Sequence, residues 1–333
     1  MRIFFSLFVL VFFTFTIFLY NLSNKTIYAY EDRGRVLGVS EGAGNEKIEN
    51  VKNENKSSFP VNDTKSEEVQ DDKPSTPVKI AKSKNIDGVN GAVIDCGSGE
   101  MLYDDGDEKS VQIASITKLA TNLVFLRYRP DWKRVYKISN RDMVGGGKNY
   151  VAIGNELTLR DLFSLSLVAS ENNATMALVN STGLKKEEFV KEMNSLADEL
   201  GLKKTNFNDP IGLSKYNVSV PREIAILAKA AFEQKDIMET VAKHEYNLVV
   251  KGRGVRKIES TNELFKSKKK KDIAVLGGKT GFTELAGYCF VGKFTNSDGD
   301  EVISVVLGEG TNSARFKNSE ALAESVYKSY KWE

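Results

Sequence analysis

The sequence predicts an α+β fold in which an antiparallel sheet of about five strands is flanked by helices and interrupted by a helical insertion. Two observations lead to this prediction. Strand-like runs occur at 89–103 and again over 246–307, whereas much of the stretch over 114–233 carries apolar residues at the spacing of a helix. A last amphipathic helical pattern closes the chain, and the sequence contains no internal repeat.

The first predicted element is a hairpin at the edge of the sheet. Residues 89–95 and 100–103 are short strand-like runs, and the turn residues Cys96-Gly97-Ser98-Gly99 lie between them. A helix is predicted next, over 114–128, because apolar residues recur there at spacings of three and four: Ile116, Leu119, Ala120, Leu123 and Val124.

Three further helices have recognisable ends. Thr158 is a candidate N-cap for a helix over 159–169, and a helix over 186–200 ends at Gly201. Pro221 suits the first turn of a helix that runs to about residue 233, since proline lacks an N–H that the first turn would leave unused.

After residue 245 the apolar pattern returns to a period of two. Residues 246–250 and 255–258 flank Lys251-Gly252-Arg253-Gly254 as a second hairpin. Three more strands are predicted, at 274–283, 287–294 and 302–307. The turn Asn296-Ser297-Asp298-Gly299 joins the last two strands, and a final helix is expected over 318–330.

The N-terminus carries an apolar segment. Residues 3–20 contain no charge, and eighteen helical residues cover about 27 Å of a hydrocarbon layer roughly 30 Å thick. We expect residues 1–30 to form an uncleaved membrane anchor with Arg2 inside; a cleaved signal peptide is the alternative, although Ile27-Tyr28-Ala29 is a poor cleavage site. Either interpretation sends the rest of the chain outside the cytoplasm.

Residues 31–85 differ in composition from residues 86–333. The stretch over 31–85 has 21 charged and 12 hydrophobic residues in 55, too little apolar side chain to offset the entropy lost on ordering. We therefore expect a disordered polar tether over 31–85 and a globular domain over 86–333.

Charge and composition exclude several classes of function. Lys and Arg total 47 against 45 Asp and Glu, a net charge of +2, which argues against a nucleic acid as the main partner. His244 is the single histidine, so a metal cage lacks ligands and we expect no metal or cofactor. Cys96 and Cys289 could pair in an oxidising compartment, but buried free thiols are the commoner state in strand-like runs, and the sequence leaves this open.

A candidate nucleophile and base occur at the start of the 114–128 helix. Ser115-Ile116-Thr117-Lys118 places a hydroxyl and an amine three residues apart, where their Cβ atoms lie about 5 to 6 Å apart on one helix face. The same spacing recurs at Ser267 to Lys270 and at Ser325 to Lys328, where a solvated helix face or loop is the plain interpretation.

Two further motifs carry candidate polar groups. Ser170-Glu171-Asn172 follows a buried helix, although Ser260-Thr261-Asn262 repeats the spacing and helix capping would explain either. Lys279-Thr280-Gly281 occurs once, inside a predicted strand, where Gly281 would let a substrate backbone lie close to the strand edge. A nucleotide-binding loop at this lysine is disfavoured because Ile273 stands where glycine is needed.

The three motifs, in this order and at these separations, resemble the signature of penicillin-binding proteins and class A β-lactamases. The stretches VLGGKTGFTELAGYCFVG, LRDLFSLSLVASENNATMALV and LGLKKTNFNDPIGL extend the resemblance to the low-molecular-mass D-alanyl-D-alanine carboxypeptidases, over about 86–333. The resemblance implies a serine D,D-peptidase catalytic domain that trims the terminal D-alanine from peptidoglycan stem peptides through an acyl-serine intermediate, with β-lactams as covalent inhibitors.

Roles for the catalytic groups follow from the resemblance. Ser115 would be the acylated nucleophile and Lys118 its base, which asks for a pKa about three units below the ordinary 10.4, from burial and from the charge of Lys279. Ser170 would relay a proton to the leaving amine, and Asn172 would hold Lys118 and the substrate amide. Lys279 would keep the pocket positive.

The resemblance also implies a set of substrate-binding groups. Thr280, with Lys279, would grip the terminal carboxylate, and Arg315 stands where the family carries a carboxylate-binding arginine. The backbone N–H groups of Ser115 and Phe282 would form the oxyanion hole.

The sequence departs from the wider family in two respects. It lacks the Glu-x-x-Leu-Asn segment that class A β-lactamases use to activate water, so fast penicillin hydrolysis is not expected. The chain stops soon after its closing helix, so we expect anchoring to fall to the N-terminal segment.

Two alternatives to a carboxypeptidase stay open: a D,D-endopeptidase on crosslinks, which would use the same residues, and a non-catalytic wall-binding or β-lactam-sensing module. The run Lys268 to Lys271 indicates a solvated loop, or attraction to anionic wall polymer or lipid.

Overall fold

The computed structural model describes residues 75–81, 88–105, 109–250, 254–267 and 272–333. The predicted anchor, most of the predicted tether and the run Lys268 to Lys271 lie outside the described residues. The chain divides into two units, Met1–Val69 and Gln70–Glu333, and everything described belongs to the second. Among the helices in the described part of the chain, none has the length and apolar character needed to cross a membrane.

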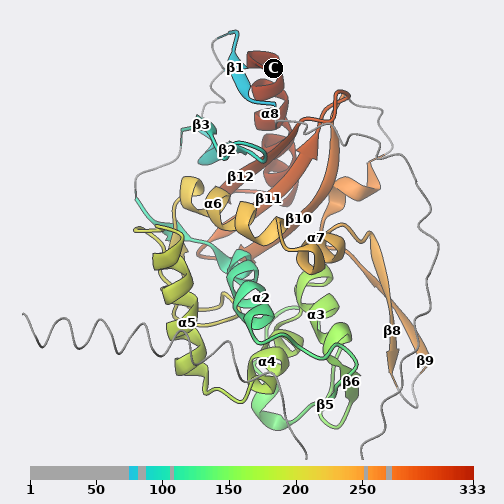
Figure 1. The fold of residues 1–333 in the computed structure, drawn as a ribbon. Coiled ribbons are helices and arrows are strands. Elements are labelled where there is room, and N and C mark those ends of the chain that lie inside the picture. The colour runs from blue at the N-terminus through green and yellow to red at the C-terminus, as the bar shows by residue number, and fades with distance from the viewer. Residues whose placement is uncertain (1–74, 82–87, 106–108, 251–253, 268–271) are drawn as a thin grey trace, which may run out of the picture. The chain divides into compact units, whose positions relative to one another are not determined.

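A five-stranded antiparallel sheet forms the centre of this unit (Figure 1). Its strands follow the order β10-β11-β12-β2-β3, which confirms the predicted strand number and the predicted edge hairpin. The bounds are β10 (Ala274–Thr283), β11 (Gly287–Thr295), β12 (Glu301–Glu309), β2 (Gly91–Asp95) and β3 (Met101–Asp104). β10 is the edge strand that carries Lys279 and Thr280.

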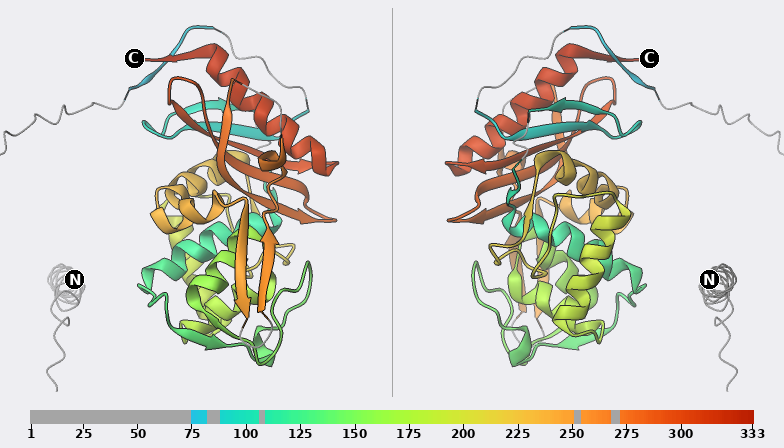
Figure 2. Two further views of the ribbon diagram at one scale, coloured as in Figure 1. Left: turned by 90° about the vertical axis from the view of Figure 1, so that its right-hand side faces the viewer. Right: turned by 90° about the vertical axis from the view of Figure 1, so that its left-hand side faces the viewer.

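Helices cover both faces of the sheet (Figure 2). Alternate residues of β12 face opposite ways: Val302 and Val306 pack with α8 (Asn312–Ser329), whereas Ile303 and Val305 belong to the larger core on the other face. That core includes α2 (Lys118–Arg127) and α6 (Pro221–Phe232). The alternation is the period-two pattern expected of a strand buried on both sides.

The predicted helical insertion lies between β3 and β10. Its helices are η1 (Ala114–Thr117), α2, η2 (Asn140–Asp142), α3 (Leu159–Val168), α4 (Asn172–Ser181), α5 (Lys186–Glu199), α6, α7 (Lys235–Val241) and η3 (Glu263–Lys266). Short strands complete it: β4 (Val111–Gln112) pairs with β7 (Val218–Ser219), β5 (Val135–Lys137) with β6 (Glu156–Thr158), and β8 (Glu245–Val250) with β9 (Gly254–Glu259).

The predicted helix ends are confirmed by their local chemistry. The Thr158 side chain accepts a hydrogen bond from the Asp161 N–H at the start of α3, and Pro221 occupies the first turn of α6. Gly201 follows the end of α5 with φ at +74°, a conformation that glycine adopts without steric cost.

Two predicted boundaries are wrong. The closing helix α8 begins at Asn312, six residues before the predicted start at 318, because Thr311 caps it by accepting from the Ala314 N–H. The predicted tether includes residues 77–79, but β1 (Pro77–Lys79) pairs antiparallel with β13 (Tyr330–Trp332). The three-residue strand has no pattern of its own and forms because the distant C-terminal strand supplies its hydrogen bonds.

Cys96 and Cys289 are both free thiols. Cys289 is buried in β11, and Cys96 is partly buried in the turn after β2. Burial raises the pKa of Cys289 to about 11 and that of Cys96 to about 12, so both thiols are protonated at neutral pH.

Candidate active site

The hydroxyl of Ser115 and the amine of Lys118 touch, as their spacing predicts. Lys118 Nζ lies 2.8 Å from Ser115 Oγ. The contact forms because Ala114–Thr117 is a 3₁₀ turn, in which residues three apart are nearly eclipsed, and α2 begins directly after it at Lys118. Ala114 precedes the serine with φ at +45°, a strained value for a non-glycine residue.

Lys118 is fully buried among three hydrogen-bond acceptors. Besides Ser115 Oγ, its Nζ contacts Asn172 Oδ1 and the Ile211 carbonyl oxygen, each at 2.8 Å. Burial lowers the pKa of Lys118 to about 7, against the opposing charges of Asp209 and Glu171. A neutral amine is therefore well populated near pH 7, as a base must be.

Ser170 and Lys279 form a second contact in the same site. Lys279 Nζ donates to Ser170 Oγ at 2.7 Å and to the Thr280 carbonyl at 2.8 Å. Ser170 occupies the sharp turn between α3 and α4 with φ at +58°, which turns the chain from one helix into the other. Lys279 is fully buried, and burial together with the charges of Lys118 and Arg315 lowers its pKa. The sequence predicts that the charge of Lys279 lowers the pKa of Lys118, whereas in the structure the charge of Lys118 lowers the pKa of Lys279.

Asn172 is the first residue of α4 and links two parts of the site. Its Oδ1 accepts from Lys118, as expected. Its Nδ2 donates to the carbonyls of Gly145 and Gly146, at 3.0 and 3.1 Å, so both amide hydrogens contact the loop before β6. The amide that is expected to hold the substrate is thus engaged by this glycine loop in the present conformation.

The close approach at Gly281 is made by the protein and not only by a substrate. A Cβ at this position would lie 2.8 Å from the Ile113 carbonyl oxygen and 3.2 Å from the Ser115 nitrogen. Gly281 therefore lets β10 pack directly against the turn that carries Ser115, which places the Ser115 N–H beside the strand. This packing is a second reason for glycine at this position, beside the room for a substrate backbone that we expect.

The remaining predicted groups lie along the same edge strand. Phe282 follows Gly281, is 48% exposed and stacks on Tyr288 with ring centroids 4.3 Å apart. Thr280 Oγ1 donates to Thr261 Oγ1 at 2.7 Å. Arg315 is buried in the first turn of α8, and its Nη1 donates to the Gly281 carbonyl at 3.0 Å. Its Nε has no hydrogen-bond partner among the described residues.

Sequence reasoning missed the groups that lie between the motifs. The Ile211 carbonyl is the third acceptor for Lys118, and a backbone oxygen leaves no side-chain signal. Thr261, in a segment considered only as a rival motif, contacts Thr280 instead. The Asp-Pro-Ile-Gly sequence at 209–212, typical of a tight turn, was the available signal for the first of these.

The rival Ser-x-x-Lys spacings and the single histidine lie on other parts of the chain, and Lys270 of one spacing lies outside the described residues. Ser325 and Lys328 belong to α8. His244, the one candidate imidazole, stacks on Phe265 with ring centroids 4.2 Å apart. Within the described residues, no group of three or more His, Cys, Asp or Glu side chains is placed to hold a metal ion.

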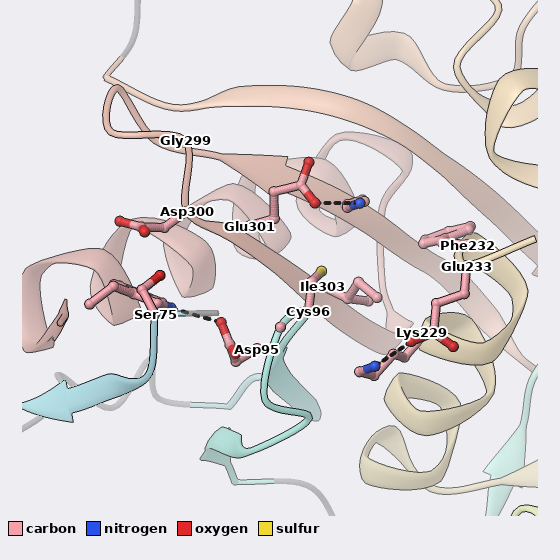
Figure 3. A pocket seen from close by; sticks show the side chains of 13 residues that line it. Ser75, Asp95, Cys96, Lys229, Phe232, Glu233, Gly299, Asp300, Glu301 and Ile303 are labelled. Carbon is pink, nitrogen blue, oxygen red and sulfur yellow. Dashed lines mark hydrogen bonds and ion pairs between the residues drawn. The ribbon is translucent and has the colours of Figure 1, made fainter. Parts of the chain in front are cut away.

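A cavity of about 310 Å³ lies elsewhere in the unit (Figure 3). It is bounded by the turns after β2 and β11, the end of α6 and the β13 strand, and none of the predicted site residues lines it. Its lysines face carboxylates: Lys229 pairs with Glu233, and Lys293 with Glu301. Asp95 at its wall accepts from Trp332 Nε1 at 2.8 Å and so holds the β13 strand in place.

The sequence matches the D-alanyl-D-alanine carboxypeptidase family over residues 77–311, more than half of the chain. A D-alanyl-D-alanine endopeptidase of Pseudomonas aeruginosa is 34% identical over 212 residues, which cover 61% of this chain and 66% of that protein. The D-alanyl-D-alanine carboxypeptidase DacF of Bacillus subtilis is 28% identical over 244 residues, 72% of this chain and 61% of the relative. The chain thus spans less than two thirds of the length of these two relatives.

Solved structures show the same fold. Penicillin-binding protein D2 of Listeria monocytogenes, in its cefotaxime-bound form, is 31% identical with a TM-score of 0.64, over 74% of this chain and 100% of that one. The Streptomyces K15 DD-transpeptidase, at 24% identity, has a TM-score of 0.68 over 74% of this chain and 100% of that chain. Together, the family match, these relatives and the convergence of three motifs on one site show that the chain belongs to the D-alanyl-D-alanine carboxypeptidase family.

Proposed function

We propose that this protein is a serine D,D-carboxypeptidase that removes the terminal D-alanine of peptidoglycan stem peptides through an acyl-serine intermediate. The observation that carries the proposal is the buried Lys118 amine in hydrogen-bond contact with Ser115 Oγ. A second pair, Ser170 and Lys279, lies in the same site. Nucleophile, base and proton relay are thus present without a histidine.

Acylation follows from this geometry. Ser115 Oγ attacks the carbonyl carbon of the bond between the last two D-alanines, and its proton passes to the neutral Lys118 Nζ. The backbone N–H groups of Ser115 and Phe282 stabilise the oxyanion, a contribution of about 2.7 to 4 kcal/mol per donor in other acyl-transfer enzymes. Arg315 and Thr280 hold the terminal carboxylate, and Lys279 adds positive charge.

Release of the leaving group and deacylation return the site to its starting state. The C–N bond breaks as the departing amine takes a proton through Ser170, whose Oγ accepts from Lys279 and is therefore free to donate its own hydrogen. The lysine pair gains a proton from Ser115 and loses one to the amine. The proton that Lys118 took from Ser115 passes to Lys279, which gave one up, so Lys118 is neutral again before deacylation. Water then attacks the acyl carbon, giving a proton to Lys118, which returns it to Ser115 Oγ as the ester bond breaks.

Release of D-alanine from a stem pentapeptide tests the proposal. We expect wild-type protein to release one D-alanine per peptide and Ser115→Ala to release none. A protein that forms a long-lived penicillin adduct yet releases no D-alanine would instead be the β-lactam-sensing module.

A D,D-endopeptidase is the second candidate, because relatives from Pseudomonas aeruginosa, Haemophilus influenzae and Escherichia coli carry that name. The same residues would cleave a crosslink between two stems. Digestion of crosslinked and monomeric muropeptides side by side separates the two activities: conversion of dimers to monomers, with pentapeptides left intact, would favour the endopeptidase.

The proposal includes a location outside the cytoplasm, where the peptidoglycan substrate lies. We propose that residues 1–30 anchor the protein in the membrane, or serve as a cleaved signal, and that the polar stretch from residue 31 to about residue 74 acts as a tether. The apolar run at 3–20 and the charged composition of 31–85 support this arrangement. Fractionation of cells into membrane and medium, with the mass of the mature protein, distinguishes an anchor from a cleaved signal.

A further inference from the structure

The loop between α5 and β7 supplies a contact that the three motifs do not. The Ile211 carbonyl accepts from Lys118 Nζ at 2.8 Å, and Asn172 Oδ1 accepts from the same nitrogen at the same distance. A neutral amine has two N–H donors and one lone pair. When these two oxygens take the two hydrogens, the lone pair is left pointing at Ser115 Oγ. The Ile211 carbonyl is therefore one of the two acceptors that orient the Lys118 amine.

The buried carboxylate of Asp209 holds this carbonyl in position. Its Oδ1 accepts from the Ile211 N–H at 2.8 Å and from the Gly212 N–H at 2.5 Å, the two amides on either side of the Ile211 carbonyl. Its Oδ2 accepts from the Ser214 N–H. One side chain thus fixes three backbone amides around the oxygen that Lys118 uses.

Asn217 joins this loop to the turn that carries the nucleophile. Its Oδ1 accepts from the Asp209 N–H at 3.0 Å, and its Nδ2 donates to the Asp209 carbonyl at 2.8 Å and to Thr117 Oγ1 at 3.0 Å. Thr117 lies between the candidate nucleophile and the candidate base in the chain. Asn217 therefore holds Asp209 in a fixed position relative to Ser115 and Lys118.

We propose that Asp209 is a positioning residue for the acylation step, which acts on Lys118 through the Ile211 carbonyl. This inference rests on the proposed function, because it assumes that Lys118 is the base. The carboxylate is required in full: an asparagine would keep one acceptor for Ile211 and Gly212 but would direct an N–H₂ group at the Ser214 N–H, and alanine would leave all three amides without their acceptor.

Asp209 also acts on Lys118 by its charge. The charged groups that face Lys118 are Asp209 from this loop, Glu171 from the start of α4 and Lys279 from β10. Asp209 raises the pKa of Lys118 and so opposes the effect of burial. Loss of this carboxylate lowers the pKa of the base, so the rise of acylation with pH moves to lower pH.

The test is the second-order rate of acylation by a fluorescent penicillin, measured from pH 5 to 9 on the full chain. We expect Asp209→Asn to acylate about tenfold more slowly than wild type and Asp209→Ala about 100-fold more slowly. Displacement of a catalytic group by about 1 Å lowers the rate on the order of 100-fold, and asparagine keeps one of the two acceptors. In both variants the pH of half-maximal acylation moves below that of wild type.

Asp95→Asn is the matched control. Asp95 is a buried carboxylate that also holds a turn, accepting from the Ser98 N–H, and it lies at the separate cavity (Figure 3). We expect this variant to lose thermal stability but to keep the acylation midpoint of wild type, with rates corrected for the folded fraction. The inference is overturned if Asp209→Asn and Asp209→Ala acylate like Asp95→Asn, with an unchanged midpoint. Failure of wild type to acylate at all would instead refute the proposed function.

Discussion

Replacement of Gly212 by alanine changes the molecule by one methyl group, yet the structure predicts a large loss of acylation. Gly212 has φ at +88°, and a Cβ added there would lie 2.0 Å from the Ala114 carbonyl oxygen and 2.9 Å from the Ser115 nitrogen. Contacts below 3.0 Å are essentially never seen for real Cβ atoms, so one backbone must retreat by about 1 Å. Whichever segment moves, Ser115 and the Ile211 carbonyl separate.

The expected magnitude follows from that displacement. A misplacement of about 1 Å in a catalytic constellation costs on the order of 100-fold in rate, which corresponds to about 2.7 kcal/mol of activation free energy. The left-handed conformation adds roughly 1 to 2 kcal/mol of lost stability for any residue with a Cβ. Acylation by a fluorescent penicillin measures the first effect, and thermal unfolding measures the second.

Gly183→Ala separates the two effects. Gly183 has the same φ of +88°, and nothing lies within 4 Å of an added Cβ. Both variants therefore carry the left-handed strain, but only Gly212→Ala pushes on the nucleophile turn. The reasoning is refuted if the folded fraction of Gly212→Ala acylates as fast as that of Gly183→Ala.

Three further outcomes are expected. Acylation should fall about tenfold for each pH unit below about 7, because Lys118 takes up its proton there. Lys118→Arg should not acylate, because a guanidinium stays charged. A flat profile from pH 5 to 8 would exclude Lys118 as the base. Arg315→Leu should raise KM for a stem pentapeptide by about tenfold or more, with Arg315→Lys between it and wild type, whereas an unchanged KM would remove Arg315 from carboxylate binding. Deletion of residues 1–74 should leave acylation and Tm unchanged, and deletion of 1–85, which also removes β1, should lower Tm by about 5 °C; equal Tm values would contradict the role of the β1–β13 pairing.

Much of the sheet could be predicted because each strand carries its own pattern. Val302, Ile303, Val305 and Val306 are apolar on both faces, and the Asn296 turn marks where the chain reverses. The β1 strand could not be predicted, since three residues form a strand only when a partner more than 250 positions away supplies their hydrogen bonds. The predicted start of α8 is too late because Arg315, in its first turn, faces the Gly281 carbonyl and interrupts the apolar periodicity.

Of the candidate site, sequence reasoning reached the side chains but not the backbone between them. Ser115, Lys118, Ser170, Asn172 and Lys279 are predicted from motifs, and the structure brings all five together. Motifs give residue types and spacing, so they could not show that the Ile211 carbonyl contacts Lys118 or that Asn172 donates to the glycine loop. Both contacts depend on how distant loops fold back, which is set by the buried groups that hold those loops.

The central claim is that Ser115 attacks the substrate carbonyl with Lys118 as its base. Intact-mass measurement of wild-type protein and Ser115→Ala, before and after incubation with penicillin, tests it most directly. We predict that wild type gains the mass of one penicillin molecule and that the variant gains none. A wild-type mass that does not change, or an adduct that persists in Ser115→Ala, would contradict the account.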